Sequence, residues 1–192
     1  IDEPSYRDPS LQILFERGQQ HEAAYVKYLA EQGKSVVNCN GKPAQTTIDM
    51  MKLGADVIVQ ATLDSGQWVG RADILVRVDT QSALGNWSYE VQDTKLSQNT
   101  KAGTILQLCL YSELLEKLQG SFAKQFHVVM PGTPYNMESY RYDDFKAYYR
   151  QVKSSLESFS DNTLATYPEP VDHRSICKFW QICDKQRHQD DY

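Results

Sequence analysis

Two aspartates and one lysine have the types and the spacing of a metal-dependent hydrolytic site. Asp73 ends a Gly-x-x-Asp stretch, Asp93 follows twenty positions later, and Lys95 lies two residues beyond Asp93. If residues 89–95 form a strand, Asp93 and Lys95 project from the same face. Two carboxylates beside one ammonium are costly to bury unless a divalent cation lies between them. We therefore expect a metal site in which Lys95 holds a water or stabilises charge on a phosphate.

Each part of this pattern has a simpler interpretation when it is considered alone. An Asp-x-Lys sequence is common, and it then forms a surface ion pair. Asp73, however, lies in the middle of an expected strand beside an apolar run, where an acid needs a partner. For Glu90 we expect a structural role on the strand face opposite Asp93. The acids at strand ends are expected at the surface, and these are Asp56, Asp64 and Asp79.

Three further polar residues lie on expected helices. Gln107 and Tyr111 are four residues apart and share one helix face, where they either meet solvent or contact a phosphate or Lys95. His21 lies on the inner face of the first helix. Its simplest role is that of a core histidine bonded to a backbone carbonyl, but beside two aspartates it becomes a third ligand for Mn²⁺ or a neighbour of Mg²⁺. Glu22 points about 100° away around the helix and ranks below His21.

The elements that must position these residues follow an α/β pattern. Residues 55–95 predict a three-stranded β-meander, which a long helix and a further strand follow. That further strand is expected to return beside the meander, in one mixed sheet flanked by helices. We expect helices over 10–32, 44–53, 102–118 and 143–159, and strands over 36–39, 55–63, 67–78, 87–95, 122–130 and 138–142.

Length and composition favour one folded domain. The chain has 192 residues, 41% of them hydrophobic, which is enough for one well-filled core. The net charge of −5 counts against tight binding to duplexes through a broad basic surface. The sequence shows neither a membrane-spanning run nor a signal-peptide pattern, so we expect a cytoplasmic protein with no membrane partner. It opens with Ile1, so we expect a piece of a longer protein, or one whose first residues are missing.

The four cysteines divide into two kinds. Without a secretory signal, disulfides are not expected, and Cys39 and Cys109 lie in apolar runs where they serve as small buried hydrophobes. Cys177 and Cys183 lie in a His-x3-Cys-x5-Cys-x4-His tail over residues 173–188. Zinc is chemically possible there, but the spacing fits no familiar zinc pattern, so a packed tail is favoured.

The combined motifs resemble the RecB-type branch of the PD-(D/E)xK nucleases. The resemblance covers most of residues 10–130, and four motifs occur in the family's order: His21, Gly-x-x-Asp73, Asp93-x-Lys95 and Gln107-x3-Tyr111. Segments 17–23 and 89–96 are similar to bacterial RecB-like nucleases, which are often fused to a superfamily 1 helicase. The CRISPR-adaptation exonucleases are more distant relatives.

This resemblance implies a restriction-endonuclease-like fold and a Mg²⁺- or Mn²⁺-dependent deoxyribonuclease, expected to be an exonuclease of DNA repair, recombination or processing. Its partners would be single-stranded or duplex DNA ends and a fused or associated helicase. The nuclease domain is expected over residues 1–170, with a cysteine-containing tail packed on it over 171–192. By position, the implied metal ligands are His21, Asp73, Asp93 and the Thr94 carbonyl, the catalytic lysine is Lys95, and the accessory motif is Gln107 with Tyr111.

Many members of this family also carry a [4Fe–4S] cluster on one early cysteine and a late C-x2-C-x5-C run. Cys177 and Cys183 fit the last two positions, but Arg174 stands at the first and no cysteine precedes His21. Because four thiolates are normally needed, we expect no complete cluster in this chain. Two alternatives stay open: a module that keeps the fold for nucleic-acid binding or assembly without turnover, and a structural zinc-tail domain.

Overall fold

The computed structural model describes residues 9–161, 177 and 179–190 of the chain. The chain divides into two compact units, one of residues 17–153 and the other of residues 1–16 with 154–192. The predicted boundary between nuclease domain and tail, at residues 170 and 171, falls outside the described residues.

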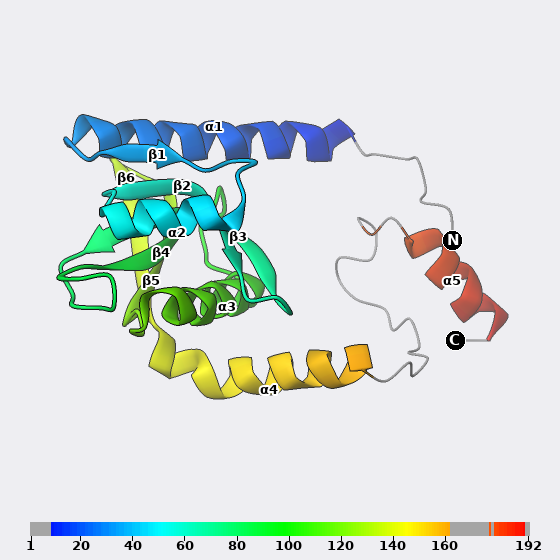
Figure 1. The fold of residues 1–192 in the computed structure, drawn as a ribbon. Helices are drawn as coiled ribbons and strands as arrows, with labels where there is room; N and C mark the ends of the chain where they lie inside the picture. The colour runs from blue at the N-terminus through cyan, green and yellow to red at the C-terminus, as the bar shows by residue number, and fades with distance from the viewer. Residues whose placement is uncertain (1–8, 162–176, 178, 191–192) are drawn as a thin grey trace. The chain divides into compact units, whose positions relative to one another are not determined.

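The larger unit is built on a six-stranded sheet whose strands follow the order of the chain (Figure 1). The neighbours β1–β2 and β4–β5 are parallel, and the other neighbours are antiparallel. The predicted α/β class is confirmed, since β2, β3 and β4 form the meander at the centre of a mixed sheet. The strands are β1 Val36–Asn38, β2 Val57–Asp64, β3 Val69–Val78, β4 Ser88–Thr94, β5 Gln125–Pro131 and β6 Tyr135–Arg141.

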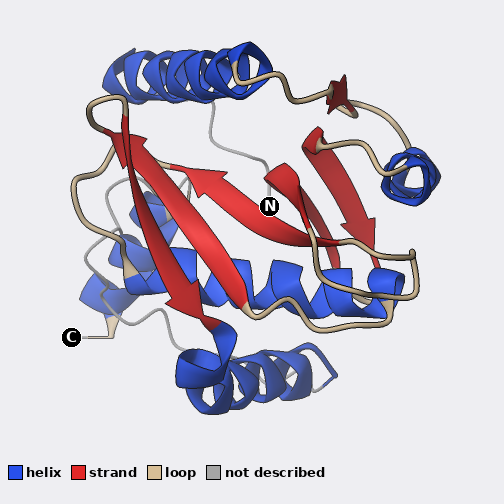
Figure 2. Ribbon diagram, turned by 90° about the vertical axis from the view of Figure 1, so that its left-hand side faces the viewer, coloured by secondary structure: helices blue, strands red, loops and turns tan. Residues whose placement is uncertain are grey.

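Helices flank both faces of this sheet. Figure 2 shows α1 along one face and α3 along the other. The helices are α1 Pro9–Glu31, α2 Ala44–Leu53, α3 Ala102–Gln119 and α4 Tyr142–Asp161. Since parallel neighbours need a long connection, α2 joins β1 to β2 and α3 joins β4 to β5. Within the described ranges, no helix is both long and apolar enough to cross a lipid bilayer.

Two apolar clusters fill the space between the helices and the sheet. On the first face, Tyr25 and Leu29 lie one turn apart on α1 and pack against apolar residues of β2, β3 and β5. On the second face, Leu108 and Leu115 of α3 are fully buried against the meander. Each such aliphatic side chain stabilises the fold by roughly 1.5–3 kcal/mol, so both helices are held firmly on the strands that carry the candidate site.

Glycines end two of these helices where the sequence predicted a stop. Gly54 follows α2 with a φ of 75°, and Gly120 follows α3 with a φ of 66°. Both residues adopt the left-handed conformation, which glycine reaches without a steric cost. Their N–H groups donate to carbonyls of the preceding turn, so each helix ends with its backbone satisfied.

Three elements differ most from the sequence-based expectation. Strand β5 begins at Gln125 and ends at Pro131, whereas a strand over 122–130 was predicted. Strand β6 begins at Tyr135 and ends at Arg141, whereas a shorter strand over 138–142 was predicted. The smaller unit contains a helix, α5, over Trp180–Gln189, where a packed tail without a named element was expected. In α5, the Arg187 guanidinium lies 2.8 Å from Asp184 Oδ1, a contact of helical spacing that supports the turn.

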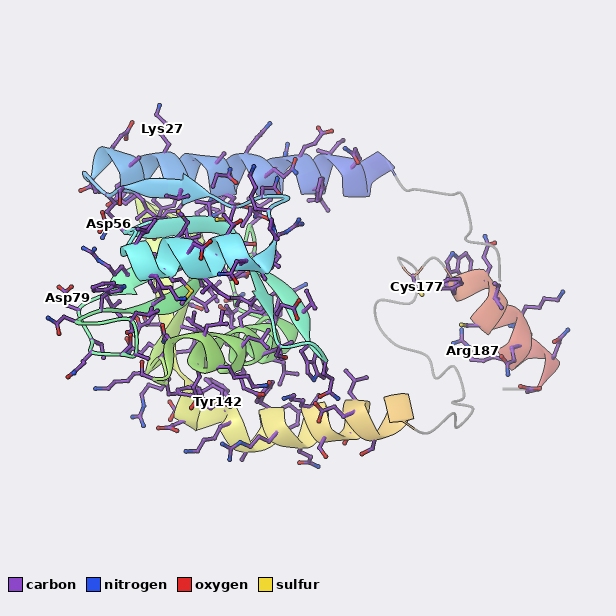
Figure 3. All side chains as sticks on the ribbon, in the orientation of Figure 1. Lys27, Asp56, Asp79, Tyr142, Cys177 and Arg187 are labelled. Carbon is purple, nitrogen blue, oxygen red and sulfur yellow. The ribbon has the colours of Figure 1, made fainter. Side chains whose placement is uncertain are left out.

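Acidic residues at the strand ends lie at the surface, as predicted. Asp64 and Asp79 are exposed, and Asp56 is partly exposed. Figure 3 shows Asp56 and Asp79 at the same end of the sheet. Hydrogen bonds from Ser35 lower the pKa of Asp56, and Arg77 pairs with this carboxylate at 2.8 Å. These aspartates therefore have ordinary surface roles.

Candidate active site

The sheet loses its regular pairing at Asp73. The β2–β3 register omits Asp73 and the residue across from it, Gln60, although it pairs the residues on either side of them. The β3–β4 register also ends beside Asp73, at Ile74 with Gln92. The flanking pairs in β2–β3 are Val59 with Ile74 and Ala61 with Ala72. Asp73 thus lies at a local interruption of the pairing of β3 with both of its neighbours.

Asp73 connects β3 to the end of β4 through its carboxylate. The Thr94 backbone N–H donates to Asp73 Oδ2 over 2.9 Å, and the Thr94 hydroxyl donates to the same oxygen over 3.1 Å. These two bonds replace the missing ladder bonds with a side-chain link. They also place the Asp73 carboxylate beside the residue that precedes Lys95, as the spacing of the motifs requires.

Asp93 is a buried carboxylate whose charge is compensated by Lys95. The side chain of Asp93 is 2% exposed, and its Oδ2 atom lies 2.6 Å from Lys95 Nζ. The contact is a close ion pair. Burial raises the pKa of Asp93 to about 6, and the nearby charge of Asp73 adds to the rise while Lys95 opposes it. The structure therefore brings Asp73, Asp93 and Lys95 together.

The raised pKa of Asp93 predicts a pH-dependent stability of the metal-free protein. The folded state binds this proton more tightly than the unfolded chain, so the Asp93 contribution to the free energy of unfolding falls as the pH rises from about 4 to about 6. The fall should reach roughly 2–3 kcal/mol. Urea unfolding at several pH values measures it, and Asp93→Asn should remove this component. Parallel profiles for the wild type and Asp93→Asn would contradict the assignment.

Glu22 and Gln60 belong to the same region. Sequence reasoning named Glu22 only as a lower-ranked candidate and did not name Gln60. The Gln60 side-chain N–H donates to Glu22 Oε1 over 2.6 Å. Burial raises the pKa of Glu22, and Asp73 raises it further, while Gln60, Arg71 and Lys95 oppose the rise. Glu22 was ranked below His21 because of its angle around the helix. The face of α1 that points to the sheet is wider than 100°, so it accommodates both residues. That width could have been used to keep Glu22 as a candidate.

His21 lies at the edge of the site on a backbone carbonyl. Its Nε2 atom is 3.2 Å from the Val129 carbonyl oxygen, which also accepts the Lys95 N–H over 3.0 Å. This geometry matches the simpler role of a core histidine, and a metal-ligand role for His21 stays a prediction. Among the described residues, no three His, Cys, Asp or Glu side chains form a ready-made metal cage.

Tyr111 packs against the glycine of the Gly-x-x-Asp stretch, and Gln107 is bonded to Tyr111. Gln107 Nε2 donates to the Tyr111 hydroxyl over 2.9 Å. The buried Tyr111 ring covers Gly70, where an added Cβ would lie 2.4 Å from ring atom Cε1. Gly70 therefore lets α3 approach the strand that carries Asp73. Contact of Gln107 with a phosphate stays a prediction.

The remaining predicted residues lie away from this cluster. Glu90 bonds to His127 over 2.9 Å, which agrees with a structural role. Cys39 and Cys109 are fully buried in the core with free thiols, as predicted. In the smaller unit Cys177 is exposed and Cys183 is partly exposed, while His173 and Arg174 fall outside the described residues.

The donor set fits a hard divalent cation. The carboxylates of Asp73 and Asp93 share the region, and Asp93 is buried. Oxygen donors are those that Mg²⁺ and Mn²⁺ prefer, and Mg²⁺ usually keeps several waters beside one or two carboxylates. Asp73 and Asp93 therefore fit a metal that completes its shell with backbone oxygen and water.

Comparison with protein-family models gives no match, and comparison with curated proteins gives none either. The functional assignment therefore depends on the sequence motifs and on the geometry of the site.

Proposed function

We propose that the chain is a Mg²⁺- or Mn²⁺-dependent deoxyribonuclease of the RecB-type PD-(D/E)xK branch, which hydrolyses DNA phosphodiester bonds and acts as an exonuclease. One observation carries the proposal. The buried Asp93 carboxylate lies beside Asp73 and 2.6 Å from the Lys95 ammonium. Two carboxylates close together in a buried site repel each other, and burial adds a desolvation cost. A divalent cation bound between them would offset both.

Asp73 and Asp93 would hold the metal, with the Thr94 carbonyl and water as further ligands. A bound Mg²⁺ or Mn²⁺ lowers the pKa of a ligand water and neutralises charge that develops on the phosphate. Thr94 fixes the Asp73 carboxylate through two hydrogen bonds. The role of Thr94 is thus to orient a ligand, which is a common function of groups around a metal.

Lys95 would act on the substrate. Its side chain is 35% exposed while its ammonium is held by Asp93. The ammonium therefore lies at the boundary between the buried carboxylate and solvent, where a phosphate can approach. Donation from Lys95 to a phosphate oxygen or to the attacking water stabilises charge in the transition state. A fused or associated helicase as partner stays part of the proposal.

A second candidate is a module that keeps this fold for nucleic-acid binding or assembly without turnover. The close Asp93–Lys95 ion pair favours it, because the lysine already compensates one carboxylate without a metal. Two measurements separate the candidates. The nuclease binds Mn²⁺ in calorimetry and shortens end-labelled DNA, whereas the module binds Mn²⁺ weakly and leaves the DNA intact.

Removing the charge of Asp73 should stabilise the metal-free protein. Asp73→Asn keeps a carbonyl acceptor for Thr94 but relieves repulsion with Asp93, so the melting temperature without metal should rise. The further rise caused by Mn²⁺ should shrink, since a tenfold loss of affinity removes about 1.4 kcal/mol of ligand-linked stabilisation. Thermal unfolding with and without Mn²⁺ measures both effects. A variant that melts lower and gains as much from Mn²⁺ as the wild type would show that the carboxylates do not share a metal.

A further inference from the structure

We infer that Gln60 is a positioning residue that holds Glu22 over the candidate active site, where Glu22 is the third carboxylate. This inference rests on the proposed function. The residue that α1 contributes to the metal site is then Glu22. The family resemblance implied His21, which contacts a backbone carbonyl.

The backbone of Gln60 is in an unfavourable conformation. Its φ is 53°, and among the described residues it is the only non-glycine with a positive φ. The left-handed region costs an ordinary residue of the order of 1 kcal/mol or more. Glycine would adopt this conformation at no steric cost. A glutamine at this position therefore indicates that its side chain is used.

The side chains of β2 change the face of the sheet on which they alternate at Gln60. Before Gln60, Val57 and Val59 pack in the cluster under α1. After it, Ala61 and Leu63 pack in the cluster under α3. In a regular strand, residues two apart lie on one face, so the alternation shifts at Gln60. It also shifts at Asp73 of β3, because Ala72 and Ile74 pack in different clusters. The same residue interrupts the pairing with β3 beside Asp73.

The Gln60 side chain then restrains Glu22. Its amide donates to Glu22 Oε1 over 2.6 Å, which ties α1 to the strand opposite Asp73. Gln60 lies across from Asp73 in the β2–β3 register, so its bond brings the Glu22 carboxylate toward the part of the sheet that carries Asp73. The bond to Oε1 leaves Oε2 able to accept from a metal-bound water or to bind the cation. Glu22 thereby adds negative charge where a divalent cation needs it.

Mn²⁺ affinity, measured by calorimetry on the whole chain, tests this role. Gln60→Gly keeps the backbone conformation and removes the amide, so its unfolding free energy without metal should stay within about 1 kcal/mol of wild type. Its Mn²⁺ affinity should fall about 10-fold or more, as for other residues that orient a ligand. Glu22→Gln should lose at least as much affinity. If Gln60→Gly does not fold, Gln60→Asn tolerates the same backbone conformation and shortens the amide.

The matched control is Gln45→Ala, which removes another glutamine–carboxylate bond, 2.8 Å to Asp49 on α2, and should leave Mn²⁺ affinity unchanged. Wild-type affinity in folded Gln60→Gly would overturn the positioning role alone. Wild-type affinity in Glu22→Gln would overturn the role of the third carboxylate. A wild-type chain that binds no Mn²⁺ would overturn the proposed function and this inference together.

Discussion

Replacing Asp93 or Lys95 with alanine should lower the rate of DNA cleavage at least ~100-fold, as the loss of other single electrostatic stabilisers does. Asp93→Ala removes the buried carboxylate, and Lys95→Ala removes the ammonium 2.6 Å from it. Lys95→Ala leaves the buried Asp93 carboxylate without its counter-charge, so a loss of stability is expected beside the loss of rate. The rates are therefore compared at a temperature at which each variant is folded. Initial rates on end-labelled DNA, at equal protein concentration and with circular dichroism of each variant, measure the effect.

Two matched controls separate a site effect from a general one. Glu90→Ala removes a carboxylate that lies on the same strand as Asp93 but bonds to His127. Lys27→Ala removes an exposed ammonium from α1. Both variants should cleave DNA at close to the wild-type rate. Near-wild-type cleavage by folded Asp93→Ala or Lys95→Ala would place the active site elsewhere in the chain.

Gly70→Ala should destabilise the fold by about 1–3 kcal/mol, the usual cost of overpacking a filled core. The new Cβ would lie 2.4 Å from the Tyr111 ring. That ring is buried, and its hydroxyl accepts a hydrogen bond from Gln107, so it has little freedom to move. For a protein of this size the melting temperature should fall by roughly 2–4 °C per kcal/mol. Urea unfolding and thermal melting measure the loss.

Gly103→Ala is the control for this prediction, because no atom lies within 4 Å of the Cβ it would add. In the first turn of α3 it should be neutral or stabilise by up to about 1 kcal/mol. Gly70→Ala combined with Tyr111→Ala should cost less than the two single changes added together, since both act on one contact. Additive losses, or a neutral Gly70→Ala, would contradict the close approach of α3 to β3.

The elements with strong local signals were predictable from the sequence. The meander and α3 contain long apolar runs, and Gly54 and Gly120 end α2 and α3 where expected. Strand β6 was predicted too short because it is a half-exposed strand at the edge of the sheet, with little apolar alternation. Helix α5 was missed because its apolar residues are few, so hydrophobic periodicity does not reveal it.

The candidate site divides in the same way. The Asp93–Lys95 contact follows from the alternation of side chains along one strand, so it could be predicted from their spacing in the sequence. The contacts of Asp73 with Thr94 and of Gln60 with Glu22 depend on where the sheet loses its pairing. At that break Gln60 has a positive φ, for which glutamine gives no local signal. The angle between Glu22 and His21 around α1 therefore does not decide which of them lies nearer the site.

Cleavage of end-labelled DNA by the wild-type chain tests the central claim most directly. Single-stranded and duplex DNA are incubated with Mn²⁺, with Mg²⁺ and with chelator, and the products are separated by length. The proposed function predicts that Mn²⁺ or Mg²⁺ yields progressively shorter products, that chelator stops the reaction, and that Asp93→Ala yields none. Intact DNA with either metal, or equal cleavage in chelator and by Asp93→Ala, would contradict a metal-dependent nuclease built on Asp73, Asp93 and Lys95.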